Sequence, residues 1–128
     1  MLTRLQVRNY VLIDSLEIDF PEGLIIITGQ TGAGKSILLG ALSLVMGAKA
    51  DASMVSEGAD NCVVEAEFET ADKTLQNVLE ENEVEWEEGH ITIRRVVNRS
   101  GRSRAFVNDC PVPVTLLQEI SSALIDIH

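Results

Sequence analysis

The sequence predicts an α/β fold built around one strand–loop–helix unit. Three observations predict it: a continuous apolar run at 24–28, a glycine-rich break at 29–36, and apolar residues at helical spacing over 35–46. Two further segments, 62–70 and 90–109, alternate apolar and polar residues as half-exposed strands do. The expected architecture is therefore a mixed sheet around a central helix, with an antiparallel β hairpin attached.

Each element has its own local signal. Residues 2–8 and 16–20 alternate as two short strands with a polar connection between them, and 21–23 form a turn before the buried strand. The helix that begins at about Lys35 is expected to stop near Gly47. The remaining predicted elements are a polar loop at 47–60, a strand at 62–70, a helix at 71–82, strands at 90–98 and 103–109 joined by "RSGR", and a helix at 114–124.

Length and composition favour one reduced, cytoplasmic domain. The 128 residues contain 45% apolar residues, which is enough for a core, and no apolar run is long enough to span a bilayer. Cys62 and Cys110 lack disulfide or metal spacing and are expected to be packing thiols. A net charge of −10 argues against broad non-specific binding to nucleic acid.

The glycine-rich break satisfies the phosphate-binding pattern GxxxxGK[ST] at every defined position. Its glycines allow the backbone N–H groups to converge on an anion, and the following helix directs its positive end at the same place. Lys35 is expected to reach the β- and γ-phosphates as the catalytic cation, and Ser36 to offer its hydroxyl to Mg²⁺. The predicted ligands are ATP and Mg²⁺, and the predicted binding residues are Gly29, Gln30, Thr31, Gly32, Ala33, Gly34, Lys35, Ser36 and Ile37.

Hydrolysis would also require a carboxylate for the metal, usually at the end of a buried strand. Asp126, in "SALIDIH", is the only candidate, although a helix end that runs into an edge strand explains this segment better. Glu65, Glu67 and Glu69 alternate with apolar residues and are expected on the wet face of a strand. The chain is therefore predicted to bind nucleotide without a full catalytic set.

Two long stretches carry a family resemblance. "RLQVRNYVLIDSLEIDF" and "GLIIITGQTGAGKSILLGALSLVMGAKAD" closely resemble the N-terminus of the RecN family, bacterial DNA-repair ATPases related to SMC proteins. "VEAEF", "IRRVVNRSGRSRAFVNDCPV" and "LIDIH" continue the match in order, so that it spans essentially the entire chain. The first stretch and the "GRSRAFVN" hairpin make the resemblance specific, since the phosphate loop alone would indicate only some P-loop protein.

The resemblance implies an ABC/SMC-type ATPase head that is split across the two ends of a long chain. Residues 1–128 would form a single N-terminal lobe, while a C-terminal lobe beyond a coiled coil would supply the signature motif and the catalytic carboxylates. Two such heads would sandwich ATP as a homodimer. DNA is the implied partner of the full-length protein, with a nucleoid-associated location in the cytoplasm and no membrane partner.

Two positions depart from the family pattern. Gln30 stands where the family commonly has glutamate, which is expected to tune affinity rather than abolish binding. Ser56 lies roughly where many relatives carry an arginine, so any role of that arginine would be absent here or taken by another residue such as Lys49.

A basic segment, 94–104, stands out in an acidic chain. It has three interpretations: contact with DNA phosphates, docking onto an acidic partner lobe, or a solvated strand face, of which the last is favoured. Phe106 beside it is expected to pack in the core. The basic residues are Arg94, Arg95, Arg99, Arg102 and Arg104.

The remaining aromatic and histidine residues carry weaker signals. Tyr10 could lie against an adenine but is more readily a surface tyrosine. Trp86, within the acidic run 80–88, is expected to cap the domain edge or mark a contact surface. His90 and His128 lack partners at metal-binding spacing and are expected to be structural.

Two other function classes fit a lone phosphate loop. A small-molecule kinase would need a mobile arginine-bearing lid, which 94–104 could imitate, although its alternation favours a fixed hairpin. A membrane-transporter ATPase fragment would be followed closely by a signature motif rather than by a coiled coil. Phosphoryl transfer to a small acceptor would favour the kinase, and the reading frame after His128 would separate the other two.

Overall fold

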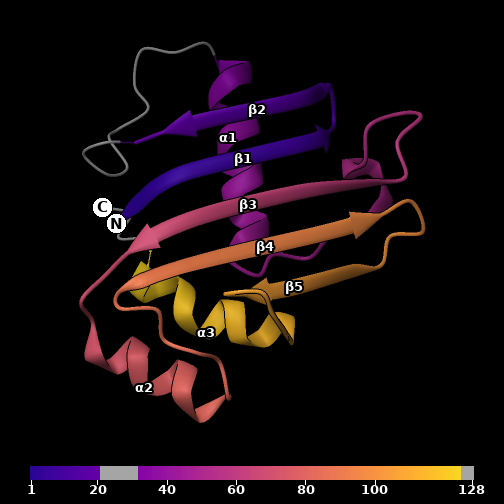
Figure 1. Ribbon diagram of the computed structural model, residues 1–128. Coiled ribbons are helices and arrows are strands. Elements are labelled where there is room, and N and C mark those ends of the chain that lie inside the picture. The colour runs from indigo at the N-terminus through magenta and orange to yellow at the C-terminus, as the bar shows by residue number, and fades with distance from the viewer. Residues whose placement is uncertain (21–31, 125–128) are drawn as a thin grey trace.

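The computed structural model describes residues 1–20 and 32–124, with only the backbone described for 32–36 and Ser122. Its centre is a six-stranded sheet in the order β2-β1-β3-β4-β5-β6, in which every described pairing is antiparallel (Figure 1). The strands are β1 (Leu2–Tyr10), β2 (Ile13–Asp19), β3 (Asn61–Glu69), β4 (His90–Asn98), β5 (Ser103–Val107) and β6 (Cys110–Val112). The helices are α1 (Gly32–Val45), the 3-10 turn η1 (Ala52–Met54), α2 (Lys73–Glu81) and α3 (Val114–Leu124).

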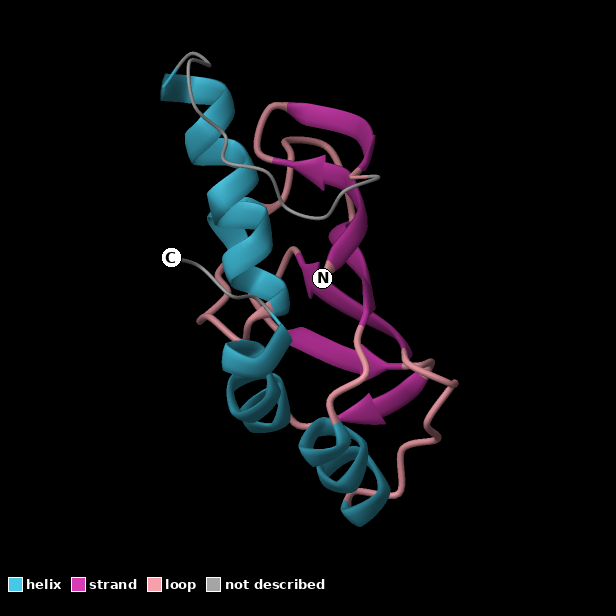
Figure 2. Cartoon of the chain, turned by 90° about the vertical axis from the view of Figure 1, so that its left-hand side faces the viewer, coloured by secondary structure: helices cyan, strands magenta, loops and turns pink. Residues whose placement is uncertain are grey.

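One face of the sheet is covered and the other is open. Figure 2 shows the three α-helices on the same side of the strands, and α1 runs across them (Figure 1). The core lies between, and the alternation of β3 explains how the sheet contributes to it: Val64, Ala66 and Phe68 are fully buried, whereas Glu65 and Glu67 face outward. This confirms the predicted wet face of β3. No described helix is both long and apolar enough to cross a membrane.

The fold class is confirmed as α/β, with the predicted strands and helices in their predicted order. The buried strand predicted at 24–28 lies outside the described residues, so the parallel component of a mixed sheet stays a prediction. The hairpin is present: β4 and β5 pair from Ile93↔Val107 to Val97↔Ser103. That fixed pairing removes the support that 94–104 gave to a kinase-like lid. β6 and η1 were not predicted, because each spans only three residues.

The connection between the first two strands differs from the prediction. Both strands are longer than expected, so that only Val11 and Leu12 separate them, and these apolar residues are 41% and 91% exposed. Val11 has a φ of 53°, which a β-branched residue adopts only under strain. The loop after α1 secures this turn: the N–H of Val11 donates to Met54 O (2.9 Å), and Ser56 Oγ donates to Val11 O (2.7 Å).

Candidate nucleotide-binding site

Helix α1 is the described part of the predicted phosphate loop. It begins at Gly32, three residues before the expected start. Gly32–Ser36 therefore lie in the first turns of the helix, where four N–H groups lack intrahelical acceptors. Gly29, Gln30 and Thr31 lie outside the described residues, as do Asp126 and His128.

The first turn of α1 suits a phosphate. It contains no acidic residue, so nothing of the helix itself opposes an anion at the positive end of the helix dipole. Ile37, the last residue of the predicted binding segment, is half-buried and packs against the core. These residues fit the phosphate tail of a nucleotide, and the Ser36 hydroxyl is of the type that coordinates Mg²⁺.

The C-terminal half of α1 is packed against the sheet. Ala41, Leu44 and Val45 are at most 1% exposed and form its buried stripe, which contacts β3 and β4. On the outer side, Leu39 is 47% exposed. The C-terminal half of the helix therefore lies firmly on the sheet.

Tyr10 is a core residue, which contradicts both sequence interpretations of it. Its side chain is 7% exposed, and burial raises its pKa. It reaches α1 at Gly40: a Cβ placed on Gly40 would lie 2.5 Å from the Tyr10 hydroxyl oxygen. The contact places the helix closer to β1 than any larger residue at position 40 would allow. Sequence spacing could not reveal this pairing, since the two residues are distant in the chain.

Gly40→Ala is expected to destabilise the chain by about 1–2 kcal/mol, because overpacking against Tyr10 outweighs the roughly 1 kcal/mol gained from helix propensity. In a Tyr10→Phe background the hydroxyl oxygen is gone, and the nearest remaining atom, Tyr10 Cζ, is at an ordinary 3.6 Å. There Gly40→Ala is expected to be neutral or stabilising. Urea unfolding of wild type, both single variants and the double variant gives the coupling. Equal effects of Gly40→Ala in both backgrounds would contradict the contact.

The C-terminal end of α1 is held by side chains from other elements. Gly47, at φ 97°, ends the helix as predicted, and its N–H donates to Leu44 O (3.1 Å). Gln118 Nε2, from α3, donates to Gly47 O (2.8 Å). Arg95 Nη1, from β4, donates to Leu44 O (2.7 Å) and Ala48 O (2.8 Å). Three carbonyls at and just beyond the helix end, those of Leu44, Gly47 and Ala48, thereby accept side-chain hydrogen bonds.

The basic segment does not form one surface. Arg95 is 2% exposed and points into the core, so its place in a basic cluster was a wrong prediction. Its neighbour Arg94 lies on the open face, 3.2 Å from Asp109 Oδ1. Arg94 and Arg104 stack over Phe106, with guanidinium carbons 4.5 Å and 5.9 Å from the ring centre. Phe106 therefore lies on the open face instead of in the core, because β5 turns Ala105 and Val107 inward.

The other residues singled out from the sequence have structural surroundings. His90 Nε2 lies 3.3 Å from Glu67 Oε1 on the open face, and Trp86 packs half-buried against the core. Ser56, which the resemblance places roughly where many relatives carry an arginine, donates a hydrogen bond to Val11 O in the β1–β2 turn. Cys62 is fully buried, and burial raises its thiol pKa, as expected for a packing residue; Cys110 is half-buried, and both are free.

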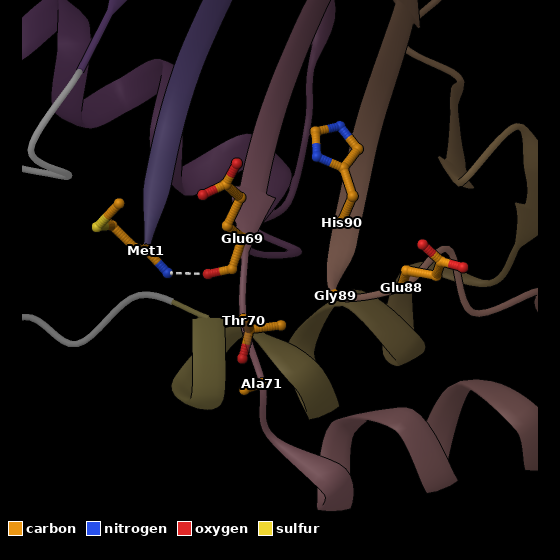
Figure 3. A pocket seen from close by; sticks show the side chains of 7 residues that line it. All are labelled: Met1, Glu69, Thr70, Ala71, Glu88, Gly89 and His90. Atoms are coloured by element: carbon orange, nitrogen blue, oxygen red, sulfur yellow. Dashed lines mark hydrogen bonds between the residues drawn. The ribbon is translucent and has the colours of Figure 1, made fainter.

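A shallow pocket of about 440 Å³ lies at the strand ends of the sheet, where β1 begins and β3 ends (Figure 3). The carboxylates of Glu69 and Glu88 line it, and the N-terminal amine of Met1 donates to the carbonyl of Glu69 (2.7 Å). The two carboxylates would oppose the binding of phosphates in this pocket.

The fold, the motif and the comparisons define an ATPase domain. The chain belongs to the AAA domain family, whose model matches residues 4–121. It is similar to the DNA repair protein RecN of Vibrio cholerae (40% identity) and of Haemophilus influenzae (37% identity), in both cases over 100% of this chain. The matches cover 23% and 24% of those relatives, so the chain spans about a quarter of their length.

Solved structures share the fold. The Smc head bound to the C-terminal winged-helix domain of ScpA superposes with a TM-score of 0.74 at 20% identity, covering 97% of this chain and 41% of that one. The SMC head domain from Thermotoga maritima gives 0.65 at 24% identity, covering 92% and 41%. The recombination mediator protein RecF-ATPrS of the RecFOR pathway gives 0.69 at 20% identity, covering 91% and 29%. The fold is thus that of the N-terminal lobe of an SMC-like P-loop ATPase head.

Proposed function

We propose that this chain is the ATP-binding lobe of a RecN-type DNA-repair ATPase. The observation that carries the proposal is the complete motif at 29–36, whose last five residues open a helix that is packed on the sheet and held at its far end. The 40% identity to a DNA repair protein supports the repair role, and membership of an ATPase domain family supports nucleotide as the ligand.

Each group of proposed binding residues would contact a different part of Mg-ATP. The backbone N–H groups of Gly29–Ser36 would hold the phosphate oxygens, and Lys35 would balance the charge of the β- and γ-phosphates. Ser36 would place its hydroxyl on Mg²⁺, which when bound supplies charge neutralisation between those phosphates. Ile37 would hold the segment against the core, since it already packs there.

Hydrolysis is proposed to need a second lobe. No group of three or more histidine, cysteine, aspartate or glutamate side chains arranged to hold a metal occurs among the described residues. The family resemblance assigns the carboxylates to a C-terminal lobe and the completed site to a homodimer of heads. We place these parts, and contact with DNA in the bacterial nucleoid, in the longer protein of which this chain would be residues 1–128.

Calorimetric titration of the purified chain with Mg-ATP tests the proposal. Weak binding is expected, with a Kd on the order of 100 μM, because one lobe supplies only half of the contacts of a sandwiched nucleotide. Phosphate release should not exceed that of a protein-free control. Absence of binding by a folded chain would overturn the assignment of the nucleotide site. Rapid turnover by the isolated chain would instead overturn the division of the catalytic site between two lobes.

A further inference from the structure

Arg95 is an unusual residue for a protein core. Of the charged side chains in residues 1–20 and 37–124, it alone is classed as buried. Burial of a cation is costly unless its donors are satisfied, and burial here lowers the pKa of the guanidinium. Within those same ranges, no carboxylate lies within ion-pair distance of it. Another interaction must therefore offset the free-energy cost of burying the Arg95 guanidinium.

That interaction is with the end of α1. Arg95 Nη1 donates to the carbonyls of Leu44 and Ala48 at 2.7 and 2.8 Å, and Nη2 donates to Ser103 Oγ at 3.0 Å. The carbonyl end of a helix carries partial negative charge, which favours a cation. The guanidinium thus joins two strands of the hairpin, β4 and β5, to the last turn of the helix whose first turns contain the last five residues of the phosphate-loop motif.

Because α1 is rigid, the hydrogen bonds of Arg95 at its C-terminal end also affect the position of its N-terminal end. The helix has 14 residues and behaves as a rod of about 21 Å. A tilt of about 3° at the anchored end would displace the first turn by about 1 Å over that length. In enzymatic reactions a misplacement of about 1 Å can lower the rate by about a hundredfold. A loss of affinity is expected for the same reason where several backbone N–H groups must converge on one phosphate.

We propose that Arg95 is a positioning residue for the phosphate loop: by fixing the C-terminal end of α1 to the hairpin, it sets where the first turn of the helix points. The proposal rests on the nucleotide-binding function proposed above. It assigns Arg95 no contact with ATP and no part in chemistry. The residue acts on the phosphates only through the helix axis.

The test compares Arg95→Met and Arg95→Lys with Arg94→Met, a matched control one residue away on the opposite face of β4. Kd for Mg-ATP is measured by calorimetry well below each variant's unfolding midpoint, and tripolyphosphate is then used as a competitor. Arg95→Met is expected to weaken binding of both ligands by about tenfold. Arg95→Lys is expected to weaken it by less, because lysine keeps the positive charge and can still donate to part of the carbonyl set. Arg94→Met should stay within about twofold of wild type.

Folded Arg95 variants that bind both ligands like wild type would overturn the proposal and leave Arg95 a purely structural residue. If Arg95→Met does not fold, Ser103→Ala decides, since it removes one acceptor and keeps the charge. Ser103→Ala is expected to raise the Kd for Mg-ATP by about two- to threefold. An unchanged Kd would overturn the proposal. A wild-type chain that binds no ATP would contradict the proposed function itself, which is a different outcome from all of these.

Discussion

Lys35→Ala is expected to weaken binding of Mg-ATP by about a hundredfold while leaving thermal unfolding nearly unchanged. A lysine in this motif contributes one full charge and a charge-assisted hydrogen bond to the phosphates, and losing both costs about 2.7 kcal/mol of binding. The fold should tolerate the change, because alanine is at least as good a helix former as lysine. Calorimetry with Mg-ATP and a circular-dichroism melt measure the two quantities separately.

Lys73→Ala provides the matched control. Lys73 is an exposed lysine in the first turn of α2, so its replacement removes the same net charge from a helix start that carries no phosphate motif. Its ATP affinity should equal that of wild type. Equal affinities for Lys35→Ala and wild type would mean that the motif does not hold the phosphates, whatever the family of the chain.

Local patterns predicted the elements that local forces determine. The alternation of "CVVEAEF" placed Val64, Ala66 and Phe68 on one face, and the structure buries all three. The β1–β2 turn was missed because what secures it is remote in sequence: Ser56 and Met54 hold Val11 in a strained conformation that the residue would not choose alone. A polar connection was the reasonable expectation without those contacts.

The same distinction explains the surroundings of α1. In "HITIRRVVN" the parity that buries Ile91, Ile93 and Val97 also places Arg95 inward, so the pattern contained the signal for its orientation. Its partners, the carbonyls of Leu44 and Ala48, lie about 50 residues earlier and could not be found from it. Charge alone therefore grouped Arg95 with Arg94, although adjacent residues of a strand face opposite sides.

Gly47→Ala is expected to destabilise the chain by about 3 kcal/mol, which is a large part of the 5–15 kcal/mol typical of a domain. At φ 97° an alanine costs at least about 1 kcal/mol. Its Cβ would also lie 2.5 Å from Gln118 Cγ, 3.0 Å from the Gln118 backbone nitrogen and 3.2 Å from Val114 O. The Gln118 side chain could rotate, but the backbone of α3 could not yield without shifting that helix away from α1. Urea unfolding measures the loss.

Gly58→Ala separates the backbone penalty at positive φ from the steric clash with α3. Gly58 has a similar φ of 85°, but a Cβ there would meet nothing within 4 Å, so only the backbone penalty of about 1 kcal/mol is expected. The difference between the two variants, about 2 kcal/mol, is then the cost of forcing α3 away from the end of α1. Equal losses at both positions would mean that α3 adjusts freely and does not hold that end. In that case the contact of Gln118 with Gly47 would contribute nothing to the placement of α1, and Arg95 would have to fix the helix end without help from α3.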